Sequence, residues 1–271
     1  MAKIFYETHF FEDPSFPVIF HYNTLTKGRF EVFPHWHINI EILYVIEGTV
    51  SITSNTAKII ANVGDIVIIN SNYLHSIQSL TKDCSYYCLI IDHEHSQKLG
   101  FDTTNNRFLS ITTDKEIKNI YNLIINEMLN QKKYYKKASV ALCTTMLILL
   151  FRNVWLNQEK EINNSDNKTS IVKQGIGYIN EHYDEDIKID DICATVGVSK
   201  YHFCRIFKEV TQKTVNEYTL SLRVQQARFL LKEKKYSVSE AAEATGFNSE
   251  SYFSKCYKKK LGILPSKERS I

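Results

Sequence analysis

The first 110 residues contain short apolar runs rich in isoleucine, valine, threonine and tyrosine. These runs cover residues 40–46, 50–53, 58–61, 66–69 and 86–91, and turn residues such as Glu47-Gly48 and Gly64-Asp65 lie between them. β-Branched and aromatic residues favour strands, whereas glycine, asparagine and aspartate favour turns. Many short strands at close spacing predict an antiparallel sandwich or barrel.

From residue 114 the hydrophobic period becomes that of a helix. Ile117, Tyr121, Ile124 and Met128 recur at intervals of three or four, and a second apolar stretch covers residues 138–151. That stretch is too short and too polar to cross a bilayer, so we expect a buried helix and no membrane partner. The pattern therefore predicts a helical hairpin over about residues 114–155, which either pairs with a second copy of the chain or packs within one.

Residues 157–170, with the sequence NQEKEINNSDNKTS, contain a single apolar residue. Such a segment cannot bury enough surface to offset the entropy lost on ordering, so it predicts a flexible linker. This places one domain at residues 1–156 and another at residues 171–271.

A pattern of residues occurs twice in the second domain, at about residues 189–210 and 238–260. In each copy a short helical stretch with small residues precedes Gly197 or Gly246, a polar residue follows, and then an aromatic pair is spaced by four. Glycine suits a turn with positive φ, and Ser199 or Asn248 would cap the next helix through its side-chain oxygen. Each copy therefore predicts a helix-turn-helix, and residues 215–232 predict one continuous helix that separates the two.

The second helix of each copy would carry polar side chains on the face opposite its aromatic pair. Donors, acceptors and cations of this kind suit the major groove of DNA. The predicted DNA-binding residues are Lys200, Tyr201, His202, Cys204, Arg205 and Lys208 in the first copy, and Ser249, Glu250, Ser251, Ser254, Lys255 and Lys258 in the second.

The excess of positive over negative charge lies in the second domain. The net charge is +3, and residues 171–271 carry 17 Lys and Arg against 13 Asp and Glu. A basic excess on this part of the chain is compatible with phosphate contacts but does not establish them.

Residues 171–271 resemble the DNA-binding domain of the AraC/XylS family of transcription regulators. The resemblance rests on GVSxxxFxRxFK at residues 197–208, LRxxxA at residues 222–227 and GFxSxSYFSKxYKKxxG at residues 246–262. It implies base-edge contacts from Tyr201, His202, Cys204 and Arg205, and from Glu250, Ser251, Ser254 and Lys255. It also implies contact with RNA polymerase, which no residue shows by itself.

The first domain contains a polar stripe on an otherwise apolar strand. His35, His37, Asn39 and Glu41 alternate with apolar residues and would share one face. Their spacing, and that of Gly64, Asn70, Asn72 and His75, resembles the two motifs of the cupin barrel, a sensor domain commonly joined to AraC-type DNA-binding domains.

Two kinds of ligand suit this stripe. Three histidines and a carboxylate are the donors of cupin metal sites and suit a transition metal, so His35, His37, Glu41 and His75 would hold any such ion. Regulators of this family more often bind an organic effector without a metal, so we expect no cofactor and a small polar effector, with a sugar as one candidate. The candidate effector-binding residues are Tyr22, His35, His37, Glu41, Tyr44, His75 and Tyr86.

The sequence thus predicts an α+β chain with two domains, a cupin-like antiparallel β-barrel with a helical hairpin and an all-α domain with two helix-turn-helix motifs. We expect a cytoplasmic protein, because no long apolar segment typical of a signal peptide begins the chain. We also expect a homodimer and, from the family resemblance, a transcription activator. We expect no enzymatic activity. The alternatives are a metal-binding cupin, either a sensor or an enzyme, fused to a DNA-binding domain, and a barrel that serves only to dimerise.

Overall fold

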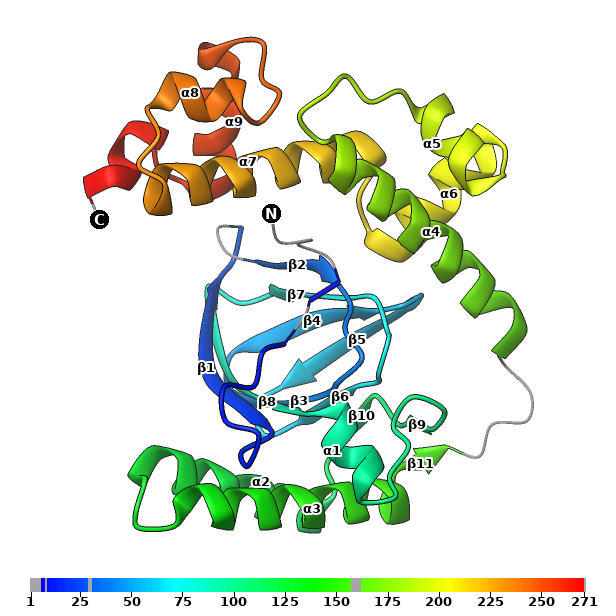
Figure 1. Cartoon of the computed structure of the whole chain (residues 1–271), viewed down its shortest axis with the longest axis vertical. Coiled ribbons are helices and arrows are strands. Elements are labelled where there is room, and N and C mark those ends of the chain that lie inside the picture. Colours follow the sequence, from blue (N-terminus) through cyan, green and yellow to red (C-terminus); the bar gives the residue numbers. More distant parts are fainter. Residues whose placement is uncertain (1–5, 8, 29–30, 157–161, 271) are drawn as a thin grey trace. The chain divides into compact units, whose positions relative to one another are not determined.

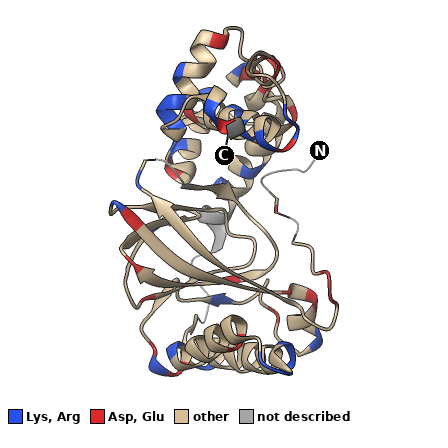
Figure 2. Cartoon of the chain, turned by 90° about the vertical axis from the view of Figure 1, so that its left-hand side faces the viewer, with Lys and Arg blue, Asp and Glu red and all other residues tan. Residues whose placement is uncertain are grey.

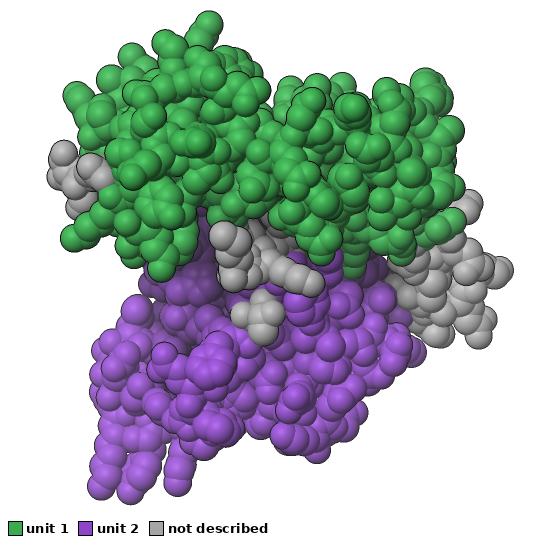
Figure 3. Space-filling model, turned by 45° about the horizontal axis from the view of Figure 1, so that its top comes forward, with its two compact units in different colours: residues 1–5, 28–30, 163–271 green, residues 6–27, 31–162 purple. Residues whose placement is uncertain are grey.

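The computed structural model describes residues 6–7, 9–28, 31–156 and 162–270. They form two compact units, one of residues 6–27 and 31–162 and the other essentially of residues 163–271 (Figure 3). The first unit is rich in strands and the second is helical, so the predicted α+β architecture is confirmed.

Two antiparallel sheets build the first unit (Figure 1). The five-stranded sheet has the order β1-β8-β3-β6-β10 and the four-stranded sheet the order β2-β7-β4-β5. The strands of the first are β1 (Val18–Thr26), β8 (Asp83–Ile91), β3 (Ile40–Glu47), β6 (Ile66–Ile69) and β10 (Ile111–Thr112). Those of the second are β2 (Glu31–His35), β7 (His75–Ser79), β4 (Thr49–Ser54) and β5 (Ala57–Asn62). A short pair, β9 (Arg107–Phe108) and β11 (Trp155–Leu156), lies apart from both.

The two faces of the five-stranded sheet belong to two different hydrophobic cores. On β3, Leu43 and Val45 face the four-stranded sheet and join the core between the sheets. Ile42 and Tyr44 point to the opposite face and join a core shared with helices. The alternation of a strand explains this division, since successive side chains point to opposite faces.

Helices α2 (Lys115–Asn130) and α3 (Tyr135–Asn153) cover the outer face of the five-stranded sheet (Figure 1). Asp114 caps α2, because its side chain accepts hydrogen bonds from the backbone N–H groups of Glu116 and Ile117. Between the sheet and this hairpin, Tyr121 donates a hydrogen bond to the carbonyl oxygen of Ile42 at 2.9 Å. A short helix, α1 (His93–Lys98), follows β8. The predicted hairpin is therefore present and packs within its own chain.

In the second unit, the residues that the structure describes form helices and the loops between them. The helices are α4 (Ile162–His182), α5 (Ile189–Val196), α6 (Lys200–Thr211), α7 (Val215–Glu233), α8 (Val238–Glu243), α9 (Glu250–Leu261) and the 3-10 helix η1 (Pro265–Ser270). None of the helices in the described part of the chain is long and apolar enough to cross a membrane.

Two predictions about the boundaries of elements were incomplete. The predicted linker over residues 157–170 ends early, because α4 already begins at Ile162; residues 157–161 lie outside the described residues. Val172 and Ile176, further along α4, are buried. The polar residues that suggested a linker therefore form the first turns of a helix whose later turns are packed. Strands β1, β2 and β7 were not predicted, since their sequences mix polar and apolar residues without a clear period.

Candidate functional site

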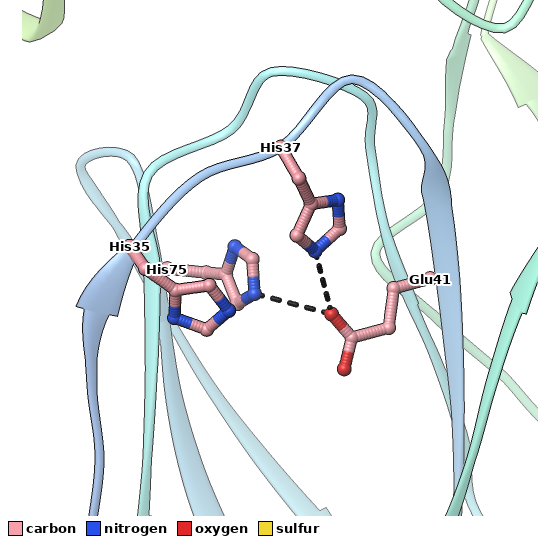
Figure 4. Close-up of side chains that lie close together, drawn as sticks. All are labelled: His35, His37, Glu41 and His75. Atoms are coloured by element: carbon pink, nitrogen blue, oxygen red, sulfur yellow. Dashed lines mark hydrogen bonds and ion pairs between the residues drawn. The ribbon is translucent and has the colours of Figure 1, made fainter. Parts of the chain in front are cut away.

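A cluster of three histidines and one carboxylate lies where the two sheets meet. His35 ends β2 and lies opposite His75 at the start of β7, His37 lies in the connection to β3, and Glu41 lies on β3. The candidate ligand atoms of these four residues all lie within 4.8 Å of one another. The side chains point toward one another (Figure 4), and those of His37, His75 and Glu41 are 1%, 0% and 7% exposed.

Each of the three imidazoles forms a hydrogen bond through Nδ1 with a backbone carbonyl oxygen. Nδ1 of His35 lies 2.8 Å from the carbonyl oxygen of Phe33. The corresponding distances are 2.9 Å from His37 to Asn39 and 2.9 Å from His75 to Tyr73. A carbonyl oxygen only accepts hydrogen bonds, so these contacts favour the tautomer with the proton on Nδ1. The three Nε2 atoms are thereby directed into the cluster.

The carboxylate of Glu41 is the centre of the cluster. Its Oε2 lies 3.0 Å from Nε2 of His37 and 3.2 Å from Nε2 of His75. Its Oε1 accepts a hydrogen bond from the thiol of Cys88 at 3.1 Å. Burial by itself raises the pKa of Glu41, but the contacts of its carboxylate with Nε2 of His37 and of His75 outweigh burial and hold the pKa well below the usual value.

His75 has an oxygen atom near each of its two ring nitrogens. Burial, aided by the charge of His35, lowers the pKa of His75 to about 4, so this ring is neutral at pH 7. A neutral imidazole has one N–H group, whereas both of its nitrogens face an oxygen that accepts hydrogen bonds. A cation between Nε2 of His75 and Glu41 would satisfy both groups. The cluster therefore has the chemistry of a cation site or of a site for a ligand that donates hydrogen bonds.

The first helix-turn-helix in the second unit is formed by α5 and α6. Gly197 ends α5 in the left-handed conformation with a φ of 70°, and Ser199 caps α6 by accepting a hydrogen bond from the N–H of His202. Phe203 and Phe207 are fully buried, with ring centroids 5.4 Å apart. The aromatic pair anchors α6 and leaves its opposite face to solvent.

The second helix-turn-helix repeats this arrangement in α8 and α9. Gly246 has a φ of 75°, and Phe253 and Tyr257 are fully buried with centroids 5.5 Å apart. The cap is Ser249, which accepts from the N–H of Tyr252 at 3.3 Å, and not Asn248 as the sequence predicted. The helix begins one residue later than the first copy implied, because the second copy contains one additional residue before its aromatic pair.

Comparison with protein families identifies both units. Residues 18–137 match the family described as AraC-like ligand binding domain, and residues 192–270 match the family described as helix-turn-helix domain. The chain belongs to the AraC family. It is thus a DNA-binding transcription regulator with a ligand-binding domain, as the sequence predicted.

Two relatives of this AraC-family chain align with it over most of both lengths. The uncharacterized HTH-type transcriptional regulator YdeC of Bacillus subtilis strain 168 is 29% identical over 265 residues, which cover 92% of this chain and 90% of YdeC. The melibiose operon regulatory protein of Escherichia coli strain K12 is 22% identical and covers 88% and 83%. Among solved structures, ToxT from Vibrio cholerae strain SCE256, with bound unsaturated fatty acid, aligns with 92% of this chain and 94% of ToxT at 15% identity and a TM-score of 0.43.

The candidate DNA-binding residues of this regulator all lie on α6, on α9 or at the cap of α9. Each is exposed or half-exposed, and Tyr201 is the most exposed aromatic residue of α6 at 81%. Arg205 lies with Nη2 3.4 Å from Nδ1 of His202, and Lys200 forms an ion pair with Asp190 at 3.0 Å. Lys and Arg occur along the helices of this unit, interspersed with Asp and Glu (Figure 2). Ser249 has a second role, since its hydroxyl oxygen caps α9.

Among the aromatic residues predicted to bind the effector, only Tyr86 lies in the core between the sheets. Tyr44 packs under the helices, with its ring centroid 5.4 Å from that of Tyr121. Tyr22 is 53% exposed and contacts Tyr87 on the same outer side of the sheet. The structure therefore separates Tyr22 and Tyr44 from the other candidate effector-binding residues, because both lie on strand positions that alternate away from the space between the sheets.

Two residues that sequence reasoning missed adjoin the cluster. Oε2 of Glu7 lies 3.1 Å from Nε2 of His35, and the ring of His9 lies with its centroid 4.6 Å from that of His37. Both come from an irregular segment outside the cupin motifs. The alternation of Glu7 and His9 was a weak signal that resembles the one at His35 and His37.

Proposed function

We propose that this AraC-family regulator alters transcription when a small polar ligand binds at the histidine cluster. The observation that carries this proposal is a buried carboxylate, Glu41, surrounded by imidazoles inside a domain of the ligand-binding family. Burying a carboxylate costs free energy unless polar or charged groups bind it, so a polar or charged ligand suits this position. Ligand binding would shift the population between two arrangements of the chain, one of which binds its operator or activates transcription better.

A sugar is the effector that we would examine first. One relative is named for the melibiose operon, and the cluster offers carboxylate and imidazole acceptors to the hydroxyl groups of a sugar. A ligand that binds only the folded chain raises its thermal midpoint. Sugars should therefore raise the midpoint of the wild-type chain and of Glu47→Gln, at the other end of β3, but not that of Glu41→Gln. Equal stabilisation of both variants would place the effector elsewhere.

Binding to operator DNA is expected to fall steeply with salt, because cations released from phosphates drive association. The measurement is affinity for a fragment selected from genomic DNA, over a series of salt concentrations. A flat response would contradict an interface through α6 and α9.

We further propose a cytoplasmic homodimer that activates transcription through RNA polymerase and has no catalytic activity. Leu123 on α2 is 50% exposed, and Leu129 is 62% exposed, so this helix offers apolar side chains to a second copy. Sedimentation equilibrium should show a dimer for the wild type and a monomer for Leu123→Glu. A monomeric wild type would contradict the dimer without affecting the assignment of the DNA-binding unit.

A metal ion is the second candidate for the ligand of the cluster. The donor set fits, because three Nε2 atoms and one carboxylate converge and each Nδ1 is held by a backbone carbonyl, as in many histidine–metal sites. His35, His37, His75 and Glu41 would hold the ion, and the ion would supply positive charge for binding an oxygen-bearing effector. Untagged protein purified without chelators should then carry about one transition metal per chain, and His35→Ala/His75→Ala should lose it.

A further inference from the structure

The turn between α2 and α3, at one end of the helical hairpin (Figure 1), carries a concentrated positive charge. Residues 132–137 have the sequence KKYYKK, and their four lysines are a quarter of the 16 Lys and Arg in residues 1–170. All four lysines are exposed. Residues 128–158 contain no Asp or Glu, although residues 1–170 carry 17 of them. The turn is therefore a basic patch on a part of the chain that is not basic as a whole.

One lysine of this patch is neutralised within the chain. Nζ of Lys136 lies 2.8 Å from Oδ2 of Asp13. The other lysines form no ion pair with a carboxylate of the described residues, and they are Lys132, Lys133 and Lys137. These three ammonium groups, together with Tyr134, form a surface that we name the basic turn.

Tyr134 gathers two of the charges of the basic turn. The ammonium groups of Lys133 and Lys137 lie 5.1 Å and 5.8 Å from the centroid of its ring, which is 64% exposed as a residue. The backbone of Tyr134 has a φ of 71°, a conformation that bulky residues seldom adopt and that occurs most often at functional sites. The turn thus holds two cations beside one aromatic ring whose hydroxyl group can also donate a hydrogen bond to an anion.

The lysines of the turn do not stabilise the helix that follows it. Tyr134 is the N-cap of α3 and forms no capping hydrogen bond through its side chain, whereas Asp114 caps α2. The first turn of α3 contains Lys136 and Lys137 and no acidic residue. Cations are unfavourable there, because the N-terminus of a helix is the positive end of its dipole. Helix stability therefore does not explain the basic turn, and a nearby anionic partner would offset the repulsion.

The composition of the basic turn favours DNA over an acidic protein surface as that partner. Protein interfaces are enriched in arginine and depleted in lysine, and this patch contains lysine alone. A DNA duplex presents a dense row of phosphates, which flexible ammonium groups neutralise without a fixed geometry. The chain is a DNA-binding regulator, and a duplex continues on both sides of an operator. Phosphate groups are therefore the anions that this chain meets at high density.

We propose that the basic turn contacts the phosphates of double-stranded DNA, so that the ligand-binding unit adds a sequence-independent contact to those predicted for α6 and α9. This contact needs no ligand at the histidine cluster, so it stands or falls independently of the proposed effector. Each phosphate that a lysine neutralises adds about 0.9 to the slope of log affinity against log salt concentration. Three lysines should therefore contribute about two to three to that slope.

The test compares two variants of the full chain that lose the same charge. Lys132→Gln/Lys133→Gln/Lys137→Gln removes the charge of the basic turn. The matched control replaces three exposed lysines elsewhere in the ligand-binding unit by glutamine, and they are Lys58, Lys82 and Lys115. Affinity is measured over a series of salt concentrations, for a selected operator fragment and for a duplex of random sequence.

The basic-turn variant should bind both duplexes at least about tenfold more weakly than the wild type at physiological salt, with a slope that is less steep by about two to three. Its preference for the operator over random sequence should not change, because phosphate contacts carry no sequence information. The control should keep a slope close to that of the wild type. Equal slopes for the two variants would overturn the proposal.

Amine labelling of the wild type gives a second readout that needs no substitution. Random-sequence DNA should protect the lysines of the basic turn from acetylation several-fold, as measured by mass spectrometry, and should leave Lys58, Lys82 and Lys115 accessible. Labelling of the basic turn that DNA does not change would overturn the phosphate contact. A basic-turn variant that binds DNA normally but no longer alters transcription would also overturn it, and would assign the turn to an acidic protein partner.

Discussion

Arg223 on α7 donates a hydrogen bond from Nη1 to the carbonyl oxygen of Gly246 at 2.7 Å, and so joins the helix between the two helix-turn-helix units to the turn of the second. The same guanidinium donates from Nε to the carbonyl oxygen of Tyr183 at 2.6 Å and from Nη2 to that of Glu185 at 2.7 Å. Three carbonyls from two loops are thus bound by one planar group. This side chain therefore fixes to α7 both the loop before the first helix-turn-helix and the turn of the second. Hydrophobic packing adds to this attachment.

Replacement of Arg223 by lysine should destabilise the helical unit. An ammonium group cannot donate along three fixed directions at once, so we expect a loss of about 2 kcal/mol in the free energy of unfolding. Urea unfolding followed by circular dichroism measures this loss. Gln225→Ala, at an exposed position of the same helix, is the control and should change little. A fully stable Arg223→Lys would show that the cores alone hold the two units.

The two turn glycines offer a matched pair of substitutions. Both have positive φ, but a Cβ on Gly246 would lie 2.5 Å from the carbonyl oxygen of Asp184, whereas one on Gly197 would meet nothing within 4 Å. Gly197→Ala should therefore cost only the left-handed conformation, about 1–2 kcal/mol. Gly246→Ala should cost clearly more, since the loop before α5 must also move. Equal losses in urea unfolding would contradict the close approach at Asp184.

Arg205 should read bases and not only phosphates. Arg205→Ala is expected to lose about 1–3 kcal/mol of discrimination at particular base pairs, and Lys255→Ala should do the same at others. Arg205→Lys is the informative control, because it keeps the charge but not the two-pronged geometry. Binding to a set of single-base operator variants measures the effect. If Arg205→Lys discriminates between base pairs as well as the wild type does, Arg205 contacts the phosphate backbone of DNA.

Stability in acid should depend on Glu268. Its carboxylate accepts hydrogen bonds from Nε of Arg228 at 2.8 Å and from the hydroxyl of Tyr257 at 2.9 Å. Although burial raises the pKa of Glu268, the bonds to Arg228 and Tyr257 lower it below the usual value of 4.5. The stability that this group contributes is therefore present above pH 4.5 and is lost as the pH falls through the lowered pKa.

Unfolding of Glu268→Gln at several pH values tests this dependence. The variant should be less stable than the wild type at pH 6, and the difference should shrink toward pH 3. Glu243→Gln, an exposed position on α8, is the control and should show a constant difference. A difference for Glu268→Gln that grows in acid would contradict the direction of the pKa shift.

The first turns of α4 should matter for the DNA-binding unit. Thr169 is buried, and Lys168 forms an ion pair with Glu209 of α6 at 2.8 Å. A fragment of residues 157–271 should consequently fold and bind DNA, and a fragment of residues 171–271 should unfold at a lower temperature. Identical thermal midpoints would restore the linker predicted over residues 157–170.

Local patterns were sufficient to predict the DNA-binding unit. Helix-turn-helix units are built from contacts between residues near in sequence, so the spacing of Phe203 and Phe207, and of Phe253 and Tyr257, already specified their buried faces. The predicted cap at Asn248 was wrong because either Asn248 or Ser249 can cap a helix. Only the packing of α8 and α9 selects where the turn ends.

The spacing of His35, His37 and Glu41, together with a resemblance to cupin motifs that added His75, marked the four residues of the cluster. The single strand expected to carry the first three was wrong, because His35 ends β2, His37 lies in the connection and Glu41 lies on β3 of the other sheet. The sequence by itself thus determined the two units, the double helix-turn-helix and the four residues of the cluster, because each depends on a short repeat or a fixed period. Strand alternation already puts Tyr44 on the face of β3 opposite Glu41, but only the tertiary structure covered that face with α2 and α3 and brought Glu7 and His9 to the cluster. Those placements depend on which face of a sheet a helix covers and on contacts between distant segments, and no local period encodes either of them.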